Sequence, residues 1–358
     1  MWLKKDYKAV SYVLFSCVGG LIFMRLVVYF AGAPSETYAQ ELGNNALFAL
    51  VTQLIFFLTV PFCIYKFYGN RTVKETLSFS SIGRFKAYYL LAVPLGISVY
   101  FLTVGISSAW TGLLKATGYT VASSSPDMPE TFVFGFFVAE IILTALLPAI
   151  CEEFSMRGGL LTTAQNSFKN VWCIVLCAVI FGLFHQNIRQ VFYTSLFGAL
   201  AAYLTIRTKS LYPAMLMHFT NNFFSVYISY ADNYGWAVGG GFYALLGSMP
   251  AWAVALVFLI FGAFGAAMLV LMMYVRDRSA IKQKTELIKQ RALIAQKRAA
   301  MQDETDAEIF ADLQAQAERS GYSPQRYKPS LREAAPFIAL GVVTLLTTVF
   351  TYVWGFFY

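Results

Sequence analysis

The sequence predicts an all-α protein, a polytopic transmembrane helical bundle of about nine spans with a cytoplasmic helical arm. Of its 358 residues, 58% are hydrophobic and only 13% are charged, whereas about a quarter of the residues of a soluble protein are charged. Apolar runs of roughly 18 or more residues recur, and each can cross a hydrocarbon core of about 30 Å. In lipid such runs must close their backbone hydrogen bonds internally, which requires helices here.

The apolar runs place the expected spans in order along the chain. They are 9–31, 44–65, 87–114, 131–155, 171–188, 190–206, 211–230, 251–275 and 336–358. Polar residues from Gln186 to Gln190 separate the fifth and sixth runs, and they indicate either a tight turn or a break inside the membrane. Lys4 and Lys5 precede a first run without a small-residue cleavage site, so we expect a retained helix rather than a cleaved signal peptide.

Lysine and arginine gather in alternate connections between these spans. The amino terminus, the second connection and the segment after 275 are basic, whereas 31–44 and 231–250 contain no Lys or Arg. This pattern predicts a cytoplasmic amino terminus and a carboxyl terminus on the other side. Attraction to anionic lipid explains the net charge of +8 better than nucleic-acid binding does, and we expect no nucleic-acid partner.

The segment 276–335 differs in composition from the spans around it. It is basic from Arg276 to Arg298 and acidic over 303–318, and Pro324 and Pro329 follow before the last span. We expect a helix or a helical pair that lies at the anionic inner leaflet. An arm that binds a protein partner is the alternative, and nothing in the sequence identifies that partner.

Ionisable residues inside the spans are few, and such residues are costly in a membrane and usually functional. The ionisable residues in or next to the spans are Arg25, Glu140, Glu152, Glu153, Arg157, His185 and His218. The two histidines in this set are the only ones in the chain. The five cysteines lie in apolar runs without ligand spacing, which indicates free thiols.

Helical spacing groups these residues by face. Positions four apart share a face, and three pairs have this spacing: Glu153 with Arg157, Phe181 with His185, and His218 with Asn222. Glu152 points about 100° away from Glu153. One carboxylate can therefore meet Arg157 while the other faces a cavity between helices.

This set of residues suits amide hydrolysis. A carboxylate in an apolar pocket can act as a general base, and His185 can bond the same water. His218 and the Asn222 amide can donate to an oxyanion. Arg157 would pair with Glu153, and Phe181 would pack one turn before His185. Taken singly, the histidines could instead be satisfied core residues and the Glu–Arg pair a structural one.

Three stretches carry a resemblance to a known family. Glu152-Glu153-Phe-Ser-Met-Arg157, Phe181-Gly-Leu-Phe-His185 and His218-Phe-Thr-Asn-Asn222 resemble the EExxxR, FxxxH and HxxxN motifs of the CAAX protease and bacteriocin-processing intramembrane endopeptidases, also called the Abi family. The resemblance implies that Glu152 and His185 activate water while His218 and Asn222 stabilise the oxyanion. Glu153, Arg157 and Phe181 would be supporting residues.

The resemblance covers about 131–230 and shapes the expected organisation. We expect amino-terminal helices over 1–130, a catalytic core over 131–230, a loop and eighth span over 231–275, the arm over 276–335 and a last span over 336–358. It also implies a prokaryotic cell-membrane protein whose site opens toward the cytoplasmic leaflet. The substrate would be a peptide or a membrane protein, with a prenylated CAAX substrate less expected.

Family members are described both with and without an essential metal. This sequence lacks HExxH, so zinc is not signalled, although His185, His218 and Glu152 would be its ligands if it binds. We favour catalysis that requires no cofactor. Two other functions stay open: a catalytically silent scaffold that binds a partner through 276–335, and a transporter, for which buried carboxylates are equally natural.

Overall fold

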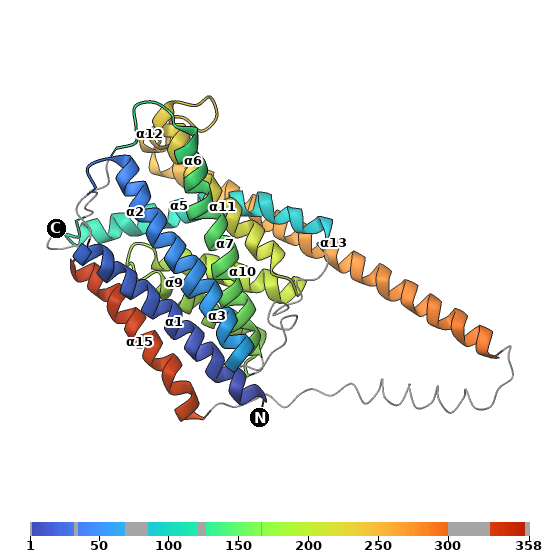
Figure 1. The fold of residues 1–358 in the computed structure, drawn as a ribbon. Coiled ribbons are helices and arrows are strands. Elements are labelled where there is room, and N and C mark those ends of the chain that lie inside the picture. Colours follow the sequence, from blue (N-terminus) through green and yellow to red (C-terminus); the bar gives the residue numbers. More distant parts are fainter. Residues whose placement is uncertain are drawn as a thin grey trace.

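The computed structural model describes residues 2–31, 35–68, 85–120, 127–165, 167–299 and 330–354. Within these ranges all regular structure is helical and no strand occurs, which confirms the predicted all-α class. Figure 1 shows the helices packed side by side as a bundle, with the far end of one long helix, α13, projecting from it. Each of the nine expected spans coincides with a helix or with a run of consecutive helices.

Five helical runs are long and apolar enough to cross a membrane. They are Lys8–Val28, Tyr38–Tyr68, Ala87–Ala116, Phe134–Gln165 and Trp252–Ser279. Asn170–Phe184 and Ile338–Trp354 are apolar but shorter. The helices α10 (Val191–Thr208) and α11 (Tyr212–Tyr234) are not among these seven, so nine spans remains a prediction.

The first helix, α1 (Trp2–Ala31), packs along the second helical run. That run consists of α2 (Tyr38–Leu50), η1 (Val51–Thr59), α3 (Val60–Cys63) and η2 (Ile64–Tyr68). Pro61 has no N–H for the carbonyl of Phe57 four residues earlier. The Ser155 hydroxyl from a neighbouring helix donates to that carbonyl at 2.5 Å. The carbonyl that Pro61 leaves without a backbone donor thus accepts a hydrogen bond from another helix.

The helical run that carries the double carboxylate is longer than expected. It consists of α6 (Phe134–Glu140), η4 (Ile141–Leu146), α7 (Leu147–Glu153), η5 (Phe154–Leu161) and α8 (Thr162–Gln165). The expected end at 155 is therefore wrong, and the carboxylates lie near the middle of the run. The sequence predicted the end too early because a charged residue such as Arg157 is typical of the end of a span. Its ion pair with Glu153 allows the helix to continue with both side chains buried.

The helices α9 (Asn170–Phe184) and α10 form a tight hairpin. A Cβ on Gly182 would lie 2.6 Å from the Val191 carbonyl oxygen, and one on Gly198 would lie 3.1 Å from that of Cys177. Small residues at such positions let two membrane helices approach closely. With 15 residues, α9 extends only about 22 Å, which is less than a hydrocarbon core of about 30 Å. The polar residues after it form a turn between α9 and α10, which is one of the two arrangements expected from the sequence.

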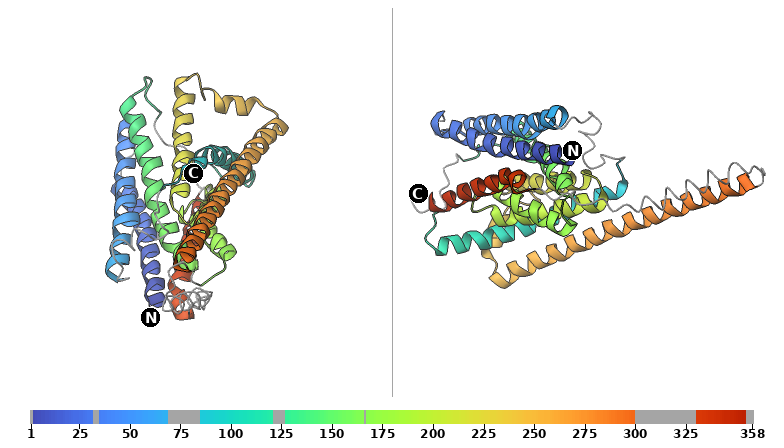
Figure 2. Two further views of the ribbon diagram at one scale, coloured as in Figure 1. Left: turned by 90° about the vertical axis from the view of Figure 1, so that its right-hand side faces the viewer. Right: turned by 90° about the horizontal axis from the view of Figure 1, so that it is seen from below.

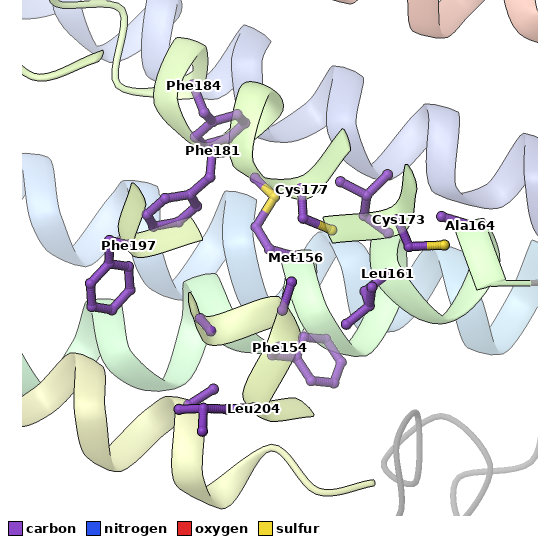
Figure 3. Packing of buried hydrophobic residues seen from close by; sticks show 14 of the residues in the cluster. Phe154, Met156, Leu161, Ala164, Cys173, Cys177, Phe181, Phe184, Phe197 and Leu204 are labelled. Atoms are coloured by element: carbon purple, nitrogen blue, oxygen red, sulfur yellow. The ribbon is translucent and has the colours of Figure 1, made fainter. Parts of the chain in front are cut away.

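α11 is the central helix of the site, because it packs against η4, α7, α10 and α5 (Ala92–Ala116). The short helices η3 (Ala87–Leu91) and α12 (Phe242–Ser248) lie at its margins. Buried apolar side chains of α9, η5 and α10, such as Phe181, Met156 and Phe197, belong to one hydrophobic cluster (Figure 3).

The carboxyl-terminal part contains two helices. α13 (Ala251–Ala299) is a single helix of 49 residues, so the expected eighth span and the first part of the arm are continuous. Its far end extends well past the other helices (Figure 2). α15 (Leu331–Trp354) packs against α1 and α9. The acidic stretch 303–318, Pro324 and Pro329 lie outside the described residues.

Candidate active site

An ion pair between Arg157 and Glu153 lies at the centre of the site and is entirely buried. Arg157 Nη1 donates to Glu153 Oε1 at 2.8 Å, and both side chains are 0% exposed, as their shared helical face predicts. Arg157 Nη2 donates to the Gly198 carbonyl at 3.2 Å. The guanidinium carbon also lies 4.5 Å from the centroid of the Phe181 ring, a cation–π contact. Arg157 therefore joins η5 to both α9 and α10.

His218 binds the same carboxylate oxygen from a different helix. Its Nδ1 lies 2.9 Å from Glu153 Oε1. Because the Arg157 pair holds this carboxylate as an acceptor, Nδ1 is the donor. The Phe197 ring packs against the imidazole with centroids 4.7 Å apart. We call Glu153, Arg157 and His218 the buried triad. The sequence had not indicated that His218 joins it.

Glu152 faces the other way, as the helical spacing predicts. Its Oε1 accepts a hydrogen bond of 2.8 Å from Gln53 Nε2, which comes from η1. The Glu152 side chain is partly exposed, whereas Glu153 is completely buried. Two adjacent carboxylates thus occupy separate environments.

A cavity of about 330 Å³ opens beside Glu152. Fourteen residues line it: Thr103, Leu143, Thr144, Pro148, Glu152, Phe181, His185, Gln190, Tyr193, Thr194, Phe197, His218, Asn221 and Asn222. Only four of these side chains lack a polar atom. The cavity can therefore offer hydrogen bonds along a peptide backbone.

His185 follows the last residue of α9 and lines the cavity. Its Nδ1 lies 2.8 Å from the Phe181 carbonyl oxygen. A carbonyl only accepts, so Nδ1 carries the proton and Nε2 of the neutral ring is left as an acceptor. Arg25 of α1 donates to the carbonyls of His185 at 2.9 Å and Gln186 at 3.1 Å. Arg25 thereby caps the end of the helix that presents His185.

The Asn222 side chain is fixed by two hydrogen bonds. Its Nδ2 donates to the Thr144 carbonyl at 2.9 Å, and its Oδ1 accepts from Asn221 Nδ2 at 2.9 Å. Pro148 has no N–H for the Thr144 carbonyl four residues earlier, so this acceptor is open to a partner from α11. An amide NH₂ has two donor hydrogens. One binds Thr144, and the other is left for a group in the cavity.

The structure places five of the seven predicted site residues around one cavity: Glu152, Phe181, His185, His218 and Asn222. Glu153 and Arg157 lie behind it. Gln53 and the Thr144 carbonyl were missed. An amide in the middle of an apolar run is a signal for Gln53, and the proline four residues later is a signal for Thr144.

The zinc ligands considered from the sequence do not converge. In the described part of the chain, no group of three or more His, Cys, Asp or Glu side chains could hold a metal ion. His185, His218 and Glu152 therefore form no such group in this part of the chain, and catalysis without a metal stays a prediction. All five cysteines are free thiols in this structure.

These features define an all-α membrane protein with carboxylate, imidazole and amide groups around a cavity between its helices. Residues 133–224 match the family model described as type II CAAX prenyl endopeptidase Rce1-like. This confirms the resemblance of the three motifs: residues 133–224 form a domain like those of the CAAX protease and bacteriocin-processing family, which supports a peptidase activity. No curated protein and no solved structure matches the chain.

The matched segment begins at the start of α6 and ends within α11. It contains every site residue predicted from the sequence. The helices α1, α2, α3, α5, α12, α13 and α15 lie outside it, and so does Gln53.

Proposed function

We propose that the protein is an endopeptidase in which Glu152 and His185 activate water to cleave a peptide bond. One observation carries this proposal. Glu152 faces the cavity together with His185, whereas Glu153 is occupied by Arg157 and His218. Neighbouring carboxylates that differ in environment take different roles, as in other two-carboxylate sites.

In the proposed reaction, a water between Glu152 and His185 attacks the carbonyl carbon of the substrate. Glu152 accepts a proton from this water, and His185 Nε2 shares it as an acceptor. The new C–O bond forms a tetrahedral intermediate with a negative oxygen. When the C–N bond breaks, the proton passes to the leaving amine.

Two groups are placed to bind the negative oxygen. The second hydrogen of the Asn222 amide is one donor. His218 is the other through Nε2, and it donates when both of its ring nitrogens carry protons, because Nδ1 is bonded to Glu153. Donors fixed in advance stabilise the charge that develops in the transition state.

The proposed substrate is an unprenylated segment of a peptide or membrane-associated protein. The support is the polar cavity lining, with Thr144, Gln190, Thr194 and Asn221 beside the proposed catalytic groups. An isoprenyl chain has no hydrogen-bonding atoms to match them. We also propose that the reaction needs no metal, that the amino terminus is cytoplasmic, and that the membrane is that of a prokaryotic cell.

The experiment that tests the proposal uses purified full-length protein in detergent with a peptide library and mass spectrometry. Cleavage is expected for the wild type and absent for Glu152→Ala and His218→Ala. Cleavage that persists in both variants would contradict the proposed mechanism. Comparing one cleaved peptide with its farnesylated form tests the substrate class, and a large preference for the farnesylated form would contradict it.

A further inference from the structure

We propose that the two amino-terminal helical runs complete the catalytic site, with Gln53 as the positioning residue of Glu152 and Arg25 as that of His185. Both residues lie outside the segment that matches the family model, 133–224. The proposal rests on the proposed roles of Glu152 and His185.

Gln53 contacts the proposed base but does not line the cavity. Its side chain is 7% exposed, and its Nε2 donates to Glu152 Oε1 at 2.8 Å. Hydrogen bonds to a charged acceptor are stronger and more directional than neutral ones. Gln53 therefore holds Glu152 Oε1 on the side of η1, and this contact orients the carboxylate toward the cavity.

The stability of the fold does not account for an amide at this position. The Gln53 Oε1 atom is buried and has no hydrogen-bond partner among the described residues. A buried acceptor without a partner is destabilising, and an apolar side chain would avoid that cost. The amide group is explained by what its nitrogen does for Glu152.

Arg25 acts on the other member of the pair through the backbone. Its two terminal nitrogens donate to the successive carbonyls of His185 and Gln186. Gln186 has a φ of 48°, which is uncommon for a residue other than glycine. Arg25 thus secures the turn at which α9 ends, and with it the direction of the His185 ring.

The amino-terminal helices are themselves joined at a close contact. The Cys17 thiol of α1 lies 3.1 Å from the Phe56 carbonyl oxygen of η1. A Cβ on Gly20 would clash with the Phe56 ring, so α1 and η1 approach closely there. Gln53 lies one turn before Phe56 on η1. The two helices therefore present Gln53 and Arg25 as one packed unit.

The test measures kcat and KM of Gln53→Met, Arg25→Met and Arg25→Lys in the full-length protein. Gln53→Met keeps the length of the side chain and removes its donor. We expect kcat to fall about 10- to 100-fold while KM changes less than about twofold. Arg25→Met should lower kcat about tenfold, and Arg25→Lys should recover part of this loss because lysine can still donate to one carbonyl.

Thr52→Val is the matched control. Thr52 is 1% exposed on the same helical run, and among the described residues its hydroxyl bonds only carbonyls of its own run. We expect its kcat to equal that of the wild type. Gln53→Asn is a second variant, for the case that Gln53→Met does not fold. It keeps a buried amide but shortens the side chain by one carbon, and its kcat should also be lower than that of the wild type.

A kcat of Gln53→Met or Gln53→Asn equal to that of Thr52→Val would overturn the proposal, as would an Arg25→Met loss that Arg25→Lys does not reduce. Gln53→Met should also add nothing to the loss in Glu152→Gln, because the two residues act as one unit. An independent, multiplicative loss would contradict the positioning role. An active Glu152→Gln would instead remove the proposed function itself, so the two failures are distinguishable.

Discussion

The site contains two polar groups of different construction. In the buried triad of Glu153, Arg157 and His218, both members of the ion pair are 0% exposed, and Arg157 also bonds the Gly198 carbonyl and packs on the Phe181 ring. The pair of Glu152 and His185 is open to a cavity and takes hydrogen bonds from helices outside the matched family segment. Two consecutive carboxylates, which point about 100° apart around one helix, thus differ in exposure and in hydrogen-bond partners.

Removing the cation of the triad should give the largest loss of stability. Arg157→Met leaves the Glu153 carboxylate buried without its ion-pair partner, which costs about 3–5 kcal/mol of unfolding free energy. Denaturant unfolding of the protein in detergent measures this loss. The double variant Glu153→Gln/Arg157→Met removes both charges and should recover most of the stability. A single variant as stable as the wild type would show that the triad is not structural.

Removing an oxyanion donor should give a large effect on rate alone. Asn222→Leu is expected to lower kcat about 10²- to 10³-fold, because the proposed role of the amide is to bind charge that exists only in the transition state. KM should change little. A raised KM with unchanged kcat would mean that Asn222 binds substrate in its ground state and would contradict the proposed role.

The smallest expected effect is that of metal removal. We expect full activity after treatment with a strong chelator and gel filtration, since Glu152, His185 and His218 do not form a metal-ligand group. Activity that is lost on chelation and restored by zinc would show that Glu152 and His185 act through a metal.

The sequence predicted the features that one helix determines by itself. Glu153 and Arg157 are four residues apart, so their pairing follows from helical geometry, and so does the different direction of Glu152. The all-α class and the approximate positions of the helices followed from apolar runs. The run that contains Glu152 was predicted too short because the burial of an internal ion pair cannot be seen in a charge pattern.

Contacts between distant helices could not be predicted in the same way. Gln53 and Glu152 are 99 residues apart, and His218 and Glu153 are 65 apart. These distances in sequence carry no periodicity, and only packing determines which side chains meet. Arg25 stood out as a charge in an apolar span, but its two carbonyl partners depend on where α9 ends.

The proposed mechanism requires that Glu152, not Glu153, activates water. The most direct test compares Glu152→Gln with Glu153→Gln, measuring kcat and unfolding free energy of each purified protein. We predict that Glu152→Gln keeps near wild-type stability and loses cleavage by about 10²- to 10⁴-fold, whereas Glu153→Gln loses stability because Arg157 is left unpaired. A Glu152→Gln variant that cleaves at the wild-type rate would show that Glu152 does not activate water.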